Sequence, residues 1–269
     1  MIWSIIIFAK TKNKNNMSKY LITGVSSGIG RALTKKLLID GETVWGIARR
    51  EQLLKNLKKE LNNPTNFTYI SMDQADKIGW QSLIKKFKKK DFIPKIIIFN
   101  AAISQNDLQS GIEIEVLEKL VEVNFLGVMR GISTLLPLVK SGTQFITISS
   151  FSALKGSGTE GIGYAASKAA VSIGFESLYQ RYKDKGIIFK TIYFGPINSG
   201  MGLFKKNIPF ILSENQAVKF IINSTKNSKG QFFYPRSIFL IFKIIKLLPS
   251  NIYFRILSRM ESINLKFRK

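Results

Sequence analysis

The segment Tyr164-Ala165-Ala166-Ser167-Lys168 places a phenol and an ammonium group four residues apart. Residues at this spacing lie on the same face of a helix. A free phenol has a pKa of about 10, and a nearby cation lowers it by favouring the phenolate. The pair therefore has the composition of a general acid/base. Tyrosine and lysine also meet at this spacing by chance on many helices, so the pair needs support from the rest of the chain.

The chain of 269 residues contains no histidine and no cysteine. Imidazole catalysis, disulfides and thiolate metal sites are therefore excluded, and we expect no metal site. Acid/base chemistry is left to Tyr, Lys, Asp or Glu. The net charge of +24 would attract an anionic membrane or nucleic acid. A solvated, Lys-rich surface explains the charge equally well, and we expect no specific nucleic-acid partner because no recognition module is visible.

Strand-like and helix-like segments alternate from residue 19 to residue 235. The apolar pattern predicts strands over residues 20–23, 43–48, 67–72, 95–99, 144–149, 187–194 and 231–235. Helical periodicity predicts helices over residues 29–38, 51–61, 78–89, 113–139 and 162–182. This alternation predicts an α/β fold with a doubly wound parallel sheet, a Rossmann fold with three α/β/α layers.

The first predicted strand meets the first helix at Thr23-Gly24-Val25-Ser26-Ser27-Gly28-Ile29-Gly30. Glycines here let the backbone approach a pyrophosphate, and the helix N-terminus offers N–H groups to it. The second strand ends at Ala48-Arg49-Arg50, where NAD sites usually carry an acid. Arginine suits the 2′-phosphate of NADP, although a solvated helix start would also explain the two arginines. We predict that NADP(H) is preferred over NAD(H).

Further motifs in this order resemble the short-chain dehydrogenase/reductase family over about residues 19–200. Phe99-Asn100-Ala101-Ala102 stands where the family has Asn-Asn-Ala-Gly, and Asp73 matches an acid that contacts adenine. Phe194-Gly195-Pro196-Ile197-Asn198-Ser199 resembles the Pro-Gly-x-x-x-Thr segment beside the nicotinamide. The expected cofactor contacts are Thr23, Gly24, Ser26, Ser27, Gly28, Ile29, Gly30, Arg49, Arg50, Asp73, Asn100, Ala101, Ala102, Tyr164, Lys168, Gly195, Pro196, Ile197 and Ser199.

The resemblance also implies a catalytic set of Asn124, Ser150, Tyr164 and Lys168. Tyr164 would protonate the developing alkoxide, and Ser150 would donate a hydrogen bond to the same oxygen. Lys168 would lower the pKa of the tyrosine and hold the ribose of the cofactor. Asn124 would fix a water that relays protons. Ser149 and Ser152 are rivals to Ser150, which precedes Tyr164 by 14 residues. Ala102, Phe194 and Ser199 depart from the family pattern, which has glycine, proline and threonine there.

These features predict an NADP-dependent oxidoreductase that transfers a hydride between nicotinamide and a carbonyl or alcohol carbon. An apolar or lipid-like ketone or aldehyde is the expected substrate, because the residues after Ser199 are apolar with flexible glycines. The alternatives are a sugar-nucleotide-modifying member of the same family and a non-catalytic nicotinamide-binding sensor or scaffold. The resemblance further implies a homo-oligomer, either a dimer or a tetramer.

The two ends of the chain differ from the middle. Residues 1–16, an apolar run followed by Lys and Asn, are too short to span a bilayer and read as an upstream extension or a weak interfacial anchor. We expect one domain over residues 17–235, with a substrate lid at about 200–213, although a packed surface helix would suit the sequence of the lid equally well. Residues 236–269 carry eight Lys/Arg and one Glu around an apolar run. We expect this basic, amphipathic extension to be helical and to contact an anionic membrane, close the pocket or form an oligomer interface. We expect a cytoplasmic protein, either free or peripheral at the inner face of the membrane.

Overall fold

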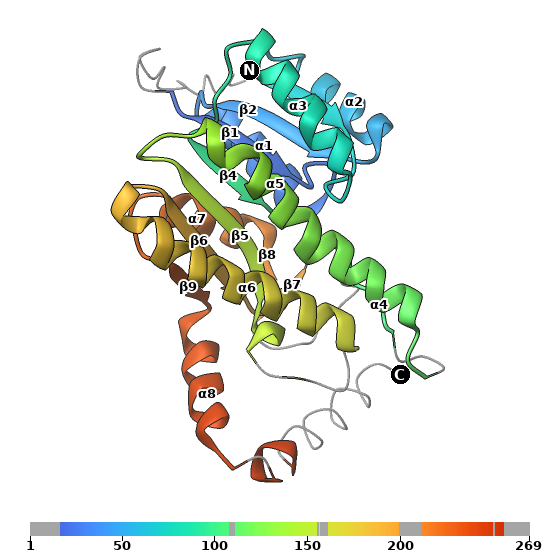
Figure 1. Ribbon diagram of the computed structural model, residues 1–269, viewed down its shortest axis with the longest axis vertical. Helices are drawn as coiled ribbons and strands as arrows, with labels where there is room; N and C mark the ends of the chain where they lie inside the picture. Colours follow the sequence, from blue (N-terminus) through green and yellow to red (C-terminus); the bar gives the residue numbers. More distant parts are fainter. Residues whose placement is uncertain are drawn as a thin grey trace, which may run out of the picture.

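The computed structural model describes residues 17–107, 111–154, 156, 161–198, 211–249 and 251–255. One parallel sheet has the strand order β3-β2-β1-β4-β5-β6-β9 (Figure 1). Its strands are β1 (Lys19–Thr23), β2 (Thr43–Ala48), β3 (Phe67–Ser71), β4 (Ile96–Phe99), β5 (Gln144–Ser150), β6 (Ile188–Phe194) and β9 (Gln231–Tyr234). The seven predicted strands and the doubly wound sheet are therefore confirmed.

Helices cover both faces of the sheet and make the three layers. One face carries α1 (Gly28–Ile39), α2 (Glu51–Glu60) and α7 (Glu214–Ser224). The other face carries α3 (Lys77–Lys89), α5 (Gly127–Leu135) and α6 (Ile162–Tyr182). Every residue of β4 is buried because its strand is covered on both sides, which explains its wholly apolar sequence.

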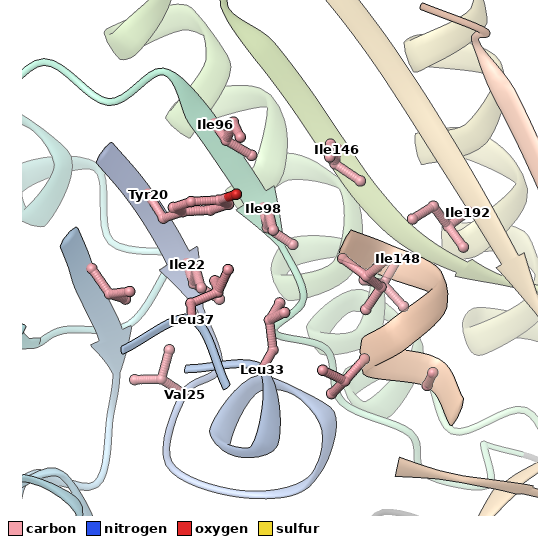
Figure 2. Packing of buried hydrophobic residues seen from close by; sticks show 14 of the residues in the cluster. Tyr20, Ile22, Val25, Leu33, Leu37, Ile96, Ile98, Ile146, Ile148 and Ile192 are labelled. Carbon is pink, nitrogen blue, oxygen red and sulfur yellow. The ribbon is translucent and has the colours of Figure 1, made fainter. Parts of the chain in front are cut away.

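The two core layers use different side chains. Between the sheet and α1, aliphatic residues dominate, and Figure 2 shows Ile22, Ile98 and Ile146 on neighbouring strands near Leu33 and Leu37 of α1. The opposite layer is richer in aromatic residues. There the rings of Phe145 and Phe189 stack 4.8 Å apart, and Phe175 of α6 meets Phe189 edge to face. The first layer holds α1 in place and the second layer holds α6. These two helices carry the predicted motifs.

The predicted helix over residues 113–139 is one continuous helix with a change of winding. It begins as α4 (Ile114–Val121), passes through a π-helical turn (Glu122–Leu126), continues as α5 and ends in a 3₁₀ turn (Leu136–Leu138). By length and composition Ile114–Leu138 would pass as a membrane span. Leu120, Val128 and Leu135 of this helix are nevertheless buried inside the protein, as in the core helix of a globular domain.

Helix α7 is an element that the sequence analysis did not predict. It begins with a capping box, in which Ser213 and Gln216 satisfy each other's backbone N–H groups. Two short strands precede it, and β7 (Ile197–Asn198) pairs in parallel with β8 (Leu212–Ser213). This pairing brings together the two ends of the predicted lid. Ser199 and residues 200–210 lie outside the described residues, as do residues 1–16 and 256–269.

After β9, α8 (Arg236–Leu247) leaves the sheet and projects away from it (Figure 1). Its first turn is attached to the body by Phe239, whose ring stacks on Phe233 of β9 with centroids 3.6 Å apart. The predicted helical character of the C-terminal extension is therefore present over its first twelve residues.

Candidate active site

The carboxyl ends of β1 and β4 meet where the strand order reverses, the position at which open α/β sheets bind ligands. Thr23 Oγ1 at the end of β1 accepts hydrogen bonds from the backbone N–H groups of Asn100 and Ala101, at 3.2 and 3.0 Å. Asn100 Nδ2 donates in return to the Thr23 and Gly24 carbonyls. These contacts hold two predicted cofactor segments side by side.

The glycine turn is packed too tightly for side chains. Gly24 has a φ of +79°, and a Cβ there would lie 2.8 Å from Ala101 Cα. A Cβ on Gly30 would overlap the Gly24 carbonyl. Helix α1 starts at Gly28 after Ser27, whose side chain makes no capping hydrogen bond, and its first turn holds no acid. The helix N-terminus is therefore suited to an anionic group such as a pyrophosphate.

The two arginines after β2 take different positions. Arg50 Nη2 donates to Ser26 Oγ at 3.1 Å and to Ser27 Oγ at 2.8 Å, so its guanidinium lies on the glycine turn. Arg49 Nη1 lies 3.6 Å from Asp73 Oδ2. Arg50 and the two serines thus assemble three side chains with donor groups beside the end of β2, a composition that suits a phosphate.

Tyr164 and Lys168 lie together on α6, as their spacing predicts. Lys168 Nζ is 5.9 Å from the centre of the Tyr164 ring. The lysine is buried, and its ammonium donates a 2.8 Å hydrogen bond to the Ile148 carbonyl of β5. Burial disfavours the charged form and lowers the Lys168 pKa to about 8. At neutral pH the lysine remains mainly protonated and places a positive charge beside the tyrosine.

Asn124 lies in the π-helical turn and is buried. Its Oδ1 accepts from the Ile103 N–H at 2.9 Å, and its Nδ2 donates to the Ile103 carbonyl at 2.9 Å and to Ser167 Oγ at 3.1 Å. One amide therefore joins the loop after β4 to α6. A π turn often occurs at functional positions, because its wider winding redirects a side chain.

The three candidate serines are separated by their surroundings. Ser149 is buried, and its Oγ lies 2.8 Å from Ser172 Oγ of α6, so it belongs to the packing between strand and helix. Ser150 is half-buried at the end of β5, where its Oγ lies 2.9 Å from Ser152 Oγ and accepts from the Ser152 N–H. The catalytic role of Ser150 remains a prediction, with Ser152 as its neighbour and rival.

Two residues of the site were not identified from the sequence. Asp107 is fully buried, and its carboxylate accepts from the N–H groups of Ile162 at 2.7 Å and Gly163 at 2.6 Å, the first turn of α6. Gln74 Nε2 donates to the Ala101 and Val123 carbonyls, at 2.8 and 2.9 Å. Both act across long sequence separations, and neither belongs to a motif that would have signalled it.

The nicotinamide segment follows β6. The Gly195 N–H donates to the Tyr234 carbonyl at 3.0 Å, and the Pro196 carbonyl accepts from the Leu212 N–H at 2.9 Å. Ile197 begins β7. The segment is therefore held between β9 and β8, while Ser199 lies outside the described residues. The switch point, the glycine turn and the Tyr–Lys pair together define a dinucleotide-binding oxidoreductase of the α/β class.

Comparison with known proteins identifies the family. The sequence profile of the short chain dehydrogenase family matches residues 18–207, so the chain belongs to the short-chain dehydrogenase/reductase family. An NADPH-dependent pterin aldehyde reductase of Arabidopsis thaliana is 32% identical over 153 residues, which cover 56% of this chain and 63% of that protein, less than two thirds of its length. A 3-oxoacyl-(acyl-carrier-protein) reductase FabG of Buchnera aphidicola is 27% identical over 219 residues, 80% of this chain and 85% of that one.

A solved structure shows the same fold. The short chain dehydrogenase of Burkholderia cenocepacia, in complex with NADP, superposes with a TM-score of 0.77 over 90% of this chain and 98% of its own, at 18% identity. Family membership and the oxidoreductase relatives make the chain an NAD(P)-dependent dehydrogenase/reductase.

Proposed function

We propose that this chain is an NADP(H)-dependent reductase of an apolar or lipid-like ketone or aldehyde, with Tyr164 as the general acid. The observation that carries the proposal is the buried Lys168 ammonium beside the Tyr164 ring, on a helix packed against the carboxyl end of β5. The cofactor, when bound, supplies or accepts the hydride. The proton transfer and the stabilisation of the substrate oxygen would be carried out by side chains of this site.

Tyr164 would deliver its proton to the substrate oxygen as negative charge develops on it. The Lys168 charge favours the phenolate that remains and also suits the ribose hydroxyls of a bound cofactor. A hydroxyl at the end of β5, Ser150 in our proposal, would donate to the same oxygen and stabilise the transition state. Asn124, which joins the Ile103 loop to Ser167, would fix the water that relays a new proton to Tyr164.

The preference for NADP(H) is supported by Arg50. Its guanidinium contacts Ser26 and Ser27 beside the end of β2, where an NADP 2′-phosphate would meet a bidentate donor and two hydroxyls. Arg49, paired with Asp73, would lie on the adenine side. Two relatives named above, the NADPH-dependent plant enzyme and the NADP-bound bacterial structure, agree with this preference.

The substrate class is inferred from carbonyl chemistry and apolar surroundings. The names of the two related reductases describe an aldehyde and an acyl-chain ketone as substrates. The sequence around the lid and the C-terminal extension is apolar, which suits an extended hydrocarbon better than a sugar nucleotide. We further propose that the chain works in the cytoplasm as a homo-oligomer, with residues 236–269 available to an anionic membrane.

A cofactor-coupled screen of carbonyls, from short ketones to long acyl chains, with NADPH and NADH in parallel, tests the proposal. We expect oxidation of NADPH with an apolar carbonyl, and loss of turnover with retained NADPH binding in Tyr164→Phe. Dominant use of NADH would refute the role given to Arg50. Full activity in Tyr164→Phe would refute the general acid, and binding without turnover of any carbonyl would favour a sensor.

A further inference from the structure

Helix α8 exposes an apolar stripe on the surface of the molecule. Leu240, Ile241, Ile244 and Leu247 are 58%, 54%, 65% and 81% exposed, respectively. Their spacing places them along one side of the helix. Ile252 and Phe254, in the short helical segment that follows, are 44% and 56% exposed. We refer to these six residues as the apolar stripe. Exposed apolar side chains gathered on a projecting helix and on the segment that follows it are typical of a contact surface.

Positive charge accompanies the apolar stripe. Arg236 and Lys243 are exposed on α8, with Lys243 one helical turn from both Leu240 and Leu247. From residue 236 to residue 255 the sequence has four Lys/Arg and no acidic residue. An apolar stripe that is accompanied by cations, in a segment without an acid from residue 236 to residue 255, matches the interface of an anionic bilayer, where side chains insert among the headgroups and ammonium groups meet phosphates.

A second copy of the chain would fit this surface less well. If two copies packed through the apolar stripe, Lys243 and Arg236 of one copy would lie near the same cations of the other. This helix has no acidic residue that would offset the repulsion. The helix has twelve residues, about 18 Å at 1.5 Å per residue, and this length is too short to cross a bilayer. It would therefore lie in the interface plane.

Two residues of the described part of the extension, Phe239 and Tyr253, contact the segment that connects Ser150 to Tyr164. Phe239 stacks on Phe233 and lies 6.4 Å, ring to ring, from Phe151, the residue after Ser150. In the short helical segment after α8, Tyr253 is buried and its hydroxyl donates to the Gly156 carbonyl at 3.1 Å. A membrane bound to the apolar stripe would thus be held beside the segment that carries the catalytic serine.

We propose that α8 and residues 251–255 form a docking surface for an anionic membrane, which places the mouth of the active site at the lipid surface. The enzyme would then draw a lipid-like carbonyl substrate from the bilayer rather than from water. This part rests on the proposed function, whereas membrane docking itself depends only on the apolar stripe and its charges.

Sedimentation with vesicles tests the docking. Full-length protein is mixed with vesicles of pure phosphatidylcholine or of phosphatidylcholine with phosphatidylglycerol. We expect binding to the anionic vesicles and its loss toward 1 M salt, where the Debye length is about 3 Å. The double variant Ile244→Asp/Leu247→Asp should lower the partition coefficient at least about tenfold, because two inserted apolar side chains are lost.

A matched control separates the apolar stripe from net charge. Ile39→Asp/Ile93→Asp adds the same two charges at residues 66% and 46% exposed, before β2 and β4, at the end of the sheet opposite the site. It should bind vesicles as the unchanged protein does. NADPH binding, followed by fluorescence, should be equal in all three proteins and shows that each is folded.

The other outcomes distinguish membrane docking from self-association and from the proposed function. No binding to anionic vesicles at low salt, or equal binding by the Ile244→Asp/Leu247→Asp variant, would overturn the docking. A change of oligomeric state in that variant, without a change in vesicle binding, would assign the surface to a second copy instead. Vesicle binding through the apolar stripe without turnover of any carbonyl would refute the proposed function and leave the docking intact.

Discussion

The carboxylate of Asp107 accepts a 2.6 Å hydrogen bond from the backbone N–H of Gly163, the residue directly before Tyr164. Its other oxygen accepts from the Ile162 N–H at 2.7 Å. A buried negative charge therefore caps the N-terminus of α6, where the helix dipole favours it. The loop after β4 therefore fixes the start of α6, and with it the position of Tyr164.

Replacement of Asp107 should affect both stability and turnover. Asp107→Ala leaves the N–H groups of Ile162 and of the buried Gly163 without their acceptor, which costs about 1–3 kcal/mol of unfolding free energy. We expect kcat to fall about tenfold or more at saturating NADPH, because a displaced tyrosine loses alignment with the substrate oxygen. Asp107→Asn, which keeps one acceptor oxygen, should recover part of kcat.

Asp76 provides the matched control for Asp107. It caps α3 by accepting from the Ile78 N–H at 2.9 Å, far along the chain from Tyr164. Asp76→Ala should cost about 1 kcal/mol in urea denaturation and leave kcat unchanged. If Asp107→Ala behaved in the same way, its role would be capping alone.

A second prediction concerns the pH dependence of stability at Lys168. Its folded pKa of about 8 lies below the value of about 10.4 for a free lysine. Between these values the unfolded chain binds more protons, so this group makes the unfolding free energy rise as pH increases through that window. Below pH 8 the burial of the charged form destabilises the fold. Lys168→Met should therefore gain about 1–3 kcal/mol at pH 7 and flatten the rise, while abolishing turnover.

Lys190 is a second buried lysine with which Lys168 can be compared. Burial also lowers its pKa to about 8, but its ammonium donates to three oxygens, those of Gln144, Ser224 and Asn227. Lys190→Met would leave these acceptors unpaired and should destabilise the protein at pH 7. Urea denaturation of both variants at pH 7 and pH 10 gives the result. Loss of stability in Lys168→Met at pH 7 would contradict the argument.

Cofactor choice should depend on Arg50. Arg50→Ala removes a charge-assisted contact worth about 1.5–3 kcal/mol to a 2′-phosphate. The Kd for NADPH should rise about tenfold to a hundredfold, whereas the Kd for NADH should change little. Isothermal titration with both cofactors measures the ratio. Arg49→Ala, which breaks the pair with Asp73, should weaken both cofactors alike, and an equal loss of NADH in Arg50→Ala would argue against phosphate recognition.

The sequence predicted the parts of this molecule that depend on local pattern. The buried strands, α6 and the glycine turn follow from apolar runs, helical spacing and glycine position, and the structure has each of them. Asp107 and Gln74 were missed because their partners lie 27 to 56 residues away and meet them only after the loops have folded. Helix α7 was also missed, although the capping box at Ser213 and Gln216 was readable.

The serine positions show the same limit at closer range. Strand alternation predicts that Ser149 and Ser150 point to opposite sides, but it does not say which side faces α6. The packing of β5 against Ser172 decides that. Side-chain direction at a strand end thus depends on the layer that covers it, which a single sequence does not state.

Gly30 should be the least replaceable glycine of the cofactor turn. A Cβ there would overlap the Gly24 carbonyl and lie 2.5 Å from Asn100 Nδ2, so α1 would have to move away from β4. Gly30→Ala should cost about 3 kcal/mol or more and abolish NADPH binding, because the helix N-terminus and the Asn100 contacts shift together. Gly174→Ala on α6, where a Cβ would meet nothing closer than 3.5 Å, should instead stabilise the helix by about 0.5–1 kcal/mol. Thermal unfolding and NADPH fluorescence of the two variants provide the comparison, and normal cofactor binding by Gly30→Ala would show that the turn has room the structure does not give it.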